Sequence, residues 1–157
     1  MNLIIFGPPG AGKGTQADFI VNKYNLYQLS TGQVLRNEID NKTELGKEIS
    51  SIIGAGSLVS DEIVKKLVEP FISDKKYRNR LIFDGYPRNL NQVETLKDLL
   101  GKYDQKIDLV LKLSVSLETI KKRISERRAI EKRADDVEEI AVKRYKTYEK
   151  STEPVIE

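Results

Sequence analysis

Short apolar runs alternate along the chain with longer segments in which apolar residues recur at helical spacing. We predict β-strands at Leu3–Phe6, Tyr27–Ser30, Leu81–Asp84 and Leu109–Val115. Helical spacing covers Gly14–Tyr24, several pieces between Thr31 and Leu100, Leu117–Arg128, and a last segment, Asp135–Ser151. Strands that alternate with helices predict an α/β fold, in which a central parallel sheet of about four strands carries helices on both faces.

The composition narrows the class of protein. A chain of 157 residues, 32% of them charged, predicts a single soluble domain, residues 1–157. No apolar run approaches the roughly 20 residues of a membrane span, and a strand pattern follows Met1 directly, so we expect a cytoplasmic protein without a membrane partner. Because Cys and His are absent, a thiolate zinc site and an imidazole base are excluded. The net charge of +3 is too balanced to predict a nucleic-acid partner.

Residues that could carry chemistry follow the predicted strands. Gly7–Thr15 comes after the first strand, Thr31 after the second, and Asp84–Arg88 spans the end of the third. Arg123 and Arg127 share a face of the helix after the fourth strand. Ligands of parallel α/β sheets bind beyond the carboxyl ends of the strands, so we expect these residues to meet at one site.

Residues 7–13, GPPGAGK, match the phosphate-binding pattern G-x-x-x-x-G-K. Glycines let backbone N–H groups turn toward a phosphate, and Lys13 would neutralise the β- and γ-phosphate oxygens. A tight turn with a surface lysine is the alternative, but it does not explain three glycines at this spacing. Gly14 stands where Ser or Thr is usual and the hydroxyl comes at Thr15, so we expect the metal to be held by phosphates and water.

Asp84 ends a predicted buried strand beside this glycine loop. An acid at such a position is suited to order Mg²⁺-bound water. Gly85 permits close approach of a ligand, and the alternative is an ordinary strand-ending turn. Arg36 and Arg88 could hold a second phosphate group. Arg144 lies on the apolar face of the last helix, where it would either form an internal salt bridge or point into an anionic site.

We favour an anionic site for Arg144, because Arg127, Arg133 and Arg144 would converge on the strand ends where the glycine loop also opens. A nucleoside triphosphate alone would not need so many cations. Phosphoryl transfer depends on positioning and on positive charge around the transferring group. Two anionic substrates in line would use Lys13 together with the arginines at positions 36, 88, 127, 133 and 144.

Six blocks of sequence together resemble the adenylate kinases, in order and over essentially the whole chain: GPPGAGKGTQA, QLSTGQVLRNEI, GSLVSDEIV, FDGYPRNLNQ, RISERR and RADDVEEIAVKRY. The resemblance implies a three-layer P-loop NTPase-type fold with a helical NMP-binding subdomain at residues 30–59 and a vestigial lid loop at residues 127–133. It also implies the reaction MgATP + AMP ⇌ 2 ADP, with Mg²⁺ as cofactor and no zinc.

The resemblance assigns site residues by position. The ATP site would comprise Gly10, Ala11, Gly12, Lys13, Gly14, Thr15, Arg123 and Arg127. The AMP site would comprise Thr31, Arg36, Ser57, Leu58, Val59, Gly85, Arg88, Gln92, Arg133 and Arg144. Lys13, Arg88, Arg127, Arg133 and Arg144 would be catalytic, and Asp84 would reach the metal through water. Thr31 and Gln92 favour AMP over the acceptors of the related UMP/CMP kinases.

The chain departs from the family pattern in three places. Gln33 replaces the usual Asp, which removes a carboxylate from the metal–water network. The short lid predicts some tolerance of GTP or other donors. The chain ends at Glu157, before the further strand of the family, so we expect an uncovered sheet edge and possible homo-oligomers. A UMP/CMP kinase and a weakly active nucleotide-binding module are the alternative functions.

Overall fold

The computed structural model describes residues 1–132 and 136–156. Its strands are β1 (Leu3–Phe6), β2 (Tyr27–Ser30), β3 (Leu81–Asp84) and β4 (Leu109–Lys112). They form one parallel sheet in the order β2-β3-β1-β4, which confirms the predicted α/β class. The fourth strand is shorter than we predicted, because the chain after Leu113 leaves the sheet for Ser116, which caps the next helix.

Seven α-helices lie in the described part of the chain: α1 (Lys13–Tyr24), α2 (Thr31–Asp40), α3 (Glu44–Gly54), α4 (Asp61–Ser73), α5 (Leu90–Lys102), α6 (Leu117–Glu131) and α7 (Glu138–Thr147). The side-chain oxygens of Ser30, Thr43, Ser60, Asn89 and Ser116 cap α2 to α6 by accepting an N–H bond from the first turn. The last helix starts later than predicted, at Glu138, and continues into a π-helical turn, Tyr148–Thr152.

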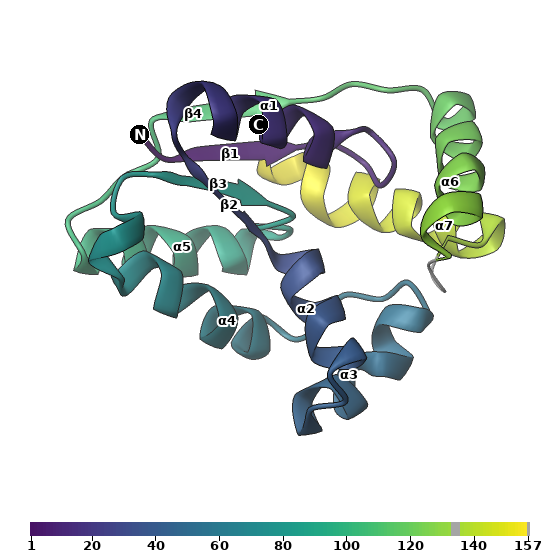
Figure 1. The fold of residues 1–157 in the computed structure, drawn as a ribbon, viewed down its shortest axis with the longest axis horizontal. Helices are drawn as coiled ribbons and strands as arrows, with labels where there is room; N and C mark the ends of the chain where they lie inside the picture. The colour runs from purple at the N-terminus through teal and green to yellow at the C-terminus, as the bar shows by residue number, and fades with distance from the viewer. Residues whose placement is uncertain (133–135, 157) are drawn as a thin grey trace.

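The side chains of β1 alternate between the two faces of the sheet. Leu3 and Ile5 pack with Ala17 of α1, whereas Ile4 and Phe6 face the cluster that contains the apolar residues of α4 and α5. Figure 1 shows α1 on one side of the sheet and α4 and α5 on the other. This alternation makes the three layers, because each face of the sheet buries its apolar side chains against helices.

Helices α2 and α3 project away from the sheet (Figure 1). They pack closely against each other at Gly46, where an added Cβ would lie 2.0 Å from the Glu38 carbonyl oxygen. Only glycine fits there, because that distance is far inside van der Waals contact. The pair lies within the predicted subdomain 30–59, whose boundaries stay a prediction.

The segment 127–133 differs from the loop that we expected. Helix α6 continues through Glu131 without a helix-breaking residue, and Lys132 ends it in the left-handed conformation at φ 51°. Residues 127–131 are therefore helical, and Arg133 lies outside the described residues. A role of this segment as a lid stays a prediction.

The β4 strand forms one edge of the sheet, with Leu109 and Val110 each 46% exposed. Association through this edge stays a prediction. Among the described residues, no helix combines the length and the apolar character that crossing a membrane requires.

Candidate functional site

The glycine loop folds around its own lysine. The Lys13 ammonium group donates hydrogen bonds to the carbonyl oxygens of Gly7 at 2.8 Å and Pro8 at 3.1 Å. Gly10, at φ +80°, lies against α6, where a Cβ would approach Ile124 Cγ1 to 3.1 Å. Arg123 of α6 donates to the Ala11 carbonyl at 3.1 Å, so the loop is held between the sheet and α6.

Lys13 lies in a strongly positive environment. Burial lowers the pKa of Lys13 from 10.5 to about 8, and the Asp84 carboxylate partly opposes this. The positive charges of Arg88, Arg144 and Arg127 lower its pKa further. Lys13 therefore interacts with three further cationic side chains and one carboxylate. The Asp136 carboxylate pairs with two of those arginines, so an excess of positive charge remains that favours a bound anion.

The segment after β3 forms a compact corner. Gly85 lies at φ +77°, and a Cβ there would come within 2.9 Å of Arg88 Nη2. Its carbonyl oxygen accepts hydrogen bonds from Thr31 Oγ1 at 2.9 Å and Arg88 Nε at 2.7 Å. Burial lowers the pKa of the Arg88 guanidinium, with Asp84 opposing. The glycine therefore lets α2 and the arginine converge on one carbonyl.

Asp84 is buried at the end of β3, where its Oδ2 accepts a hydrogen bond from Gln28 Nε2 at 2.9 Å. The described residues contain no group of three or more His, Cys, Asp or Glu that could hold a metal ion. Mg²⁺ is commonly bound by one or two carboxylates together with substrate phosphates and water. One buried carboxylate beside Lys13 fits that mode. Thr15 is exposed in the first turn of α1.

One pocket brings together most of the residues that the sequence predicted for the AMP site, together with Lys13. Its lining includes Lys13, Thr31, Arg36, Ser57, Leu58, Val59, Gly85, Arg88, Gln92 and Arg144. Arg123 and Arg127 are outside the described lining of this pocket. Chain segments from the glycine loop, α2, the end of α3 and the loop after it, the β3 corner and α7 thus meet at the carboxyl ends of the strands.

The arginines of α6 and α7 meet at a buried acid. Asp136 has a fully buried side chain, and its Oδ2 accepts a hydrogen bond from Arg127 Nε at 2.6 Å. A second bond joins Arg127 Nη2 to Asp136 Oδ1, and Arg144 Nη1 lies 3.9 Å from the same oxygen. Arg144 therefore faces an internal acid and also lines the pocket. The internal salt bridge is present, and the binding of an anion beside Arg144 stays a prediction.

Gln33 takes part in the network around Arg36. Its Oε1 accepts a hydrogen bond from Arg36 Nη2 at 3.1 Å, and its Nε2 donates to Asn37 Oδ1 at 2.8 Å. The residue that replaces the usual Asp thus supports an arginine of the pocket without adding charge.

Sequence reasoning missed several supporting residues. Asp136 lies two residues before α7, and its pairing with Arg127 and Arg144 depends on the packing of α6 against α7. Gln28 lies 56 residues before Asp84, and no spacing rule connects them. Lys143 donates to the Ala55 carbonyl at 2.7 Å and so links α7 to the loop after α3. Its only sequence signal was its place beside Arg144.

A comparison with family models matches residues 5–157 to the family described as adenylate kinase. The chain belongs to the adenylate kinase family. This confirms the resemblance of the six sequence blocks, and it places the chain among the nucleoside monophosphate kinases, which are phosphotransferases.

Similar curated proteins carry the same family name. The adenylate kinase of Pelagibacter ubique is 45% identical over 183 residues, which cover all of this chain and 86% of the relative. The adenylate kinase of Fusobacterium nucleatum is 41% identical over 179 residues, covering all of this chain and 85% of the relative. That of Bifidobacterium longum is 41% identical over 157 residues, covering all of this chain and 84% of the relative.

Proposed function

We propose that this adenylate kinase family member catalyses the reversible Mg²⁺-dependent transfer of a phosphoryl group from ATP to AMP, which yields two ADP. The observation that carries the proposal is the single pocket in which Lys13, Arg36, Arg88 and Arg144 meet. Two phosphate-bearing substrates account for this concentration of positive charge better than one does.

The donor phosphates lie on the glycine loop and the first turn of α1. Backbone N–H groups of the loop and the Lys13 ammonium hold the phosphate chain. Lys13 exchanges its bonds to the Gly7 and Pro8 carbonyls for phosphate oxygens. The negative charge of these oxygens raises the lowered pKa of Lys13 and keeps the ammonium protonated.

The acceptor lies in the pocket between α2 and the β3 corner. Arg36 and Arg88 bind the AMP phosphate, and the bond from Arg88 Nε to the Gly85 carbonyl fixes the guanidinium in place. The 57–59 segment and Thr31 line the space for the nucleoside.

Arg127 and Arg144, oriented by Asp136, stabilise the charge on the transferring phosphoryl group. Arg133, outside the described residues, is proposed for the same role. Mg²⁺, when bound, neutralises phosphate charge and aligns the donor oxygens. Asp84 would hold that ion through a water molecule.

The test measures ADP formation from ATP and Mg²⁺ with AMP, UMP or CMP as acceptor. We expect AMP to give the highest kcat/KM. In Arg88→Lys the loss of the guanidinium fork lowers kcat by about 10²–10³. Similar rates with UMP or CMP would support the pyrimidine kinases, and nucleotide binding without turnover would support a binding module.

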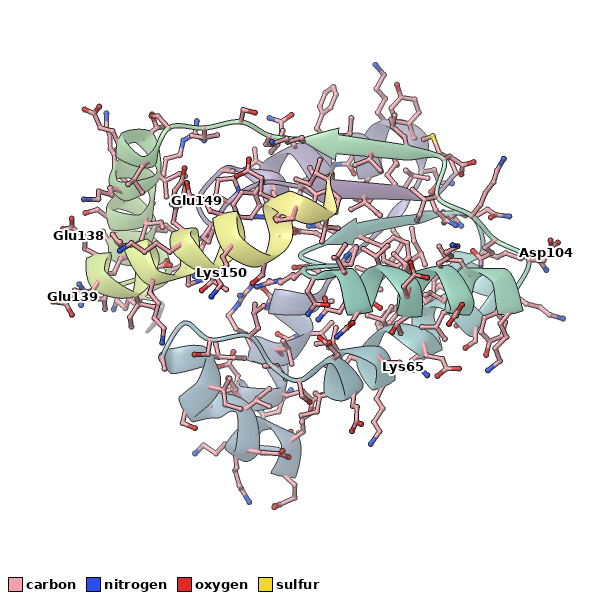
Figure 2. The ribbon with its side chains drawn as sticks, turned by 180° about the vertical axis from the view of Figure 1, so that it is seen from behind. Lys65, Asp104, Glu138, Glu139, Glu149 and Lys150 are labelled. Atoms are coloured by element: carbon pink, nitrogen blue, oxygen red, sulfur yellow. The ribbon has the colours of Figure 1, made fainter. Side chains whose placement is uncertain are left out.

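A matched control removes an arginine from elsewhere in the chain. Arg78 forms an exposed pair with Asp104 at 3.3 Å. Figure 2 shows Asp104 at the opposite end of the molecule from Glu138 and Glu139 of α7. Arg78→Lys is therefore expected to leave kcat and both KM values unchanged.

Three further features belong to the proposal. A short lid recognises the donor base only weakly, so turnover with GTP as donor is expected to lie within about tenfold of turnover with ATP. A donor panel in which ATP exceeds GTP by several orders of magnitude would contradict this. A cytoplasmic location and association through the β4 edge stay predictions from the sequence.

A further inference from the structure

Asp61 lies behind the pocket that we assign to AMP, at the first residue of α4. Its Oδ1 accepts two hydrogen bonds from the start of α5. Gln92 Nε2 donates at 2.7 Å and Asn89 Nδ2 donates at 3.0 Å. Asp61 is outside the described lining of the pocket, whereas Gln92 is part of it.

Two partners fix the orientation of the Gln92 amide, because one can only donate a hydrogen bond and the other can only accept one. The backbone N–H of Arg88 can only donate, and it donates to Gln92 Oε1 at 2.8 Å. A carboxylate can only accept, and Asp61 accepts from Gln92 Nε2. If the amide flipped, its NH2 group would face the Arg88 N–H donor and its oxygen would face the Asp61 carboxylate, so both hydrogen bonds would be lost. Asn89 Oδ1 holds the Gln92 backbone N–H at 2.8 Å, so the main chain is fixed as well.

A primary amide has two N–H donors and two acceptor positions on its oxygen. The bonds to Asp61 and Arg88 use one of each, which leaves one donor and one acceptor for a ligand. A donor beside an acceptor matches the edge of adenine, which presents a ring nitrogen acceptor beside an amino donor. Hypoxanthine has a carbonyl in place of the amino group, so the donor of this pair is replaced by an acceptor.

We propose that Asp61 is a positioning residue for acceptor specificity, which fixes the Gln92 amide in the orientation that reads adenine and rejects a 6-oxopurine. This inference rests on the proposed function, because it takes the acceptor to be AMP. Without the carboxylate, the Arg88 N–H alone restrains the amide, so one of the two hydrogen bonds that specify its orientation is lost and the buried NH2 group lacks its acceptor.

The test compares AMP with IMP, two acceptors of the same size, in three variants. Asp61→Leu removes the acceptor while keeping the volume similar. We expect the KM for AMP to rise about 10-fold and the AMP/IMP ratio of kcat/KM to fall about 10-fold, with the KM for ATP unchanged. Asp61→Asn retains an acceptor oxygen and is expected to stay within about threefold of the parent protein. Glu62→Leu, at the exposed neighbouring position, is the matched control and is expected to change neither value.

A double-mutant cycle separates positioning from a general effect on the fold. In a Gln92→Leu background, Asp61→Leu is expected to have no further effect on the KM for AMP, because its action passes through the amide. Additive effects, or equal losses for AMP, IMP and ATP, would overturn the proposal. An Asp61→Leu protein with an unchanged AMP/IMP ratio would overturn it too. Failure of the parent protein to phosphorylate AMP would instead refute the proposed function.

Discussion

Replacing Asp136 by Asn tests how strongly the fold depends on the buried acid between α6 and α7. The Asp136 side chain is fully buried, while those of Arg127 and Arg144 are 25% and 18% exposed. Removing the acid leaves two largely buried guanidinium groups facing a neutral amide. Breaking a buried ion pair from one side costs about 3–5 kcal/mol, and we expect the lower end because Asn keeps one acceptor oxygen.

A loss of about 3 kcal/mol lowers Tm by about 6–12 °C for a domain of this size. The matched control is Glu138→Gln, in the first turn of α7. Glu138 pairs with Lys121 at 3.0 Å, but the two side chains are 71% and 43% exposed. Figure 2 shows Glu138 on the outer surface of the helix. An exposed ion pair and a charge at a helix end each contribute little to stability. The free energy of unfolding of this variant should therefore fall by at most about 1 kcal/mol.

The assay is urea unfolding followed by far-UV circular dichroism, at low and at high NaCl. Salt should reduce the effect of Glu138→Gln and leave that of Asp136→Asn almost unchanged, since buried charges are screened less. If the two variants lost the same stability, or if salt removed both effects, the energetic role assigned to Asp136 would be wrong. The ADP assay should also show a lower kcat in Asp136→Asn.

Three further predictions concern the glycine loop and the metal carboxylate. Because burial lowers the pKa of Lys13 to about 8, the ammonium loses its proton above that pH, and kcat/KM for ATP should fall as pH rises through about 8. In Lys13→Arg this alkaline decrease should be absent from the pH profile. Asp84→Ala should abolish Mg²⁺-dependent ADP formation, and retained turnover at saturating Mg²⁺ would refute its role. Gly14→Ala, with no atom within 4 Å of the new Cβ, should keep or raise Tm, whereas Gly10→Ala, at φ +80° and 3.1 Å from Ile124, should lower Tm by several degrees.

The local pattern of apolar and polar residues was sufficient to predict the strands of the sheet. Each of the first three strands has the predicted bounds, because short apolar runs bounded by turn residues have few alternatives. The predicted boundaries of helices and strands were wrong where neither the apolar pattern nor a turn residue marks the end of the element. The segment after Arg127 contains no helix-breaking residue, so no local signal marks an end of α6 before Lys132.

Much of the candidate site followed from motif spacing. The glycine loop, Thr31, Asp84 and Arg88 each directly follow or end a strand, and parallel strands bring their carboxyl ends to one edge. The inward position of Arg144 followed from helical spacing. The roles of these residues stay predictions that the proposed assays test.

The residues that orient the site could not be predicted in this way. Asp61 acts on Gln92 across 31 positions, and Gln28 on Asp84 across 56. A hydrogen bond or ion pair between distant segments depends on distances of a few ångströms, which packing alone determines. The sequence by itself thus determined the order of strands and helices, the phosphate-binding loop and the set of cationic side chains. Only the tertiary structure decided which acids and amides hold those side chains, because each pairing requires two helices or strands to meet at one register.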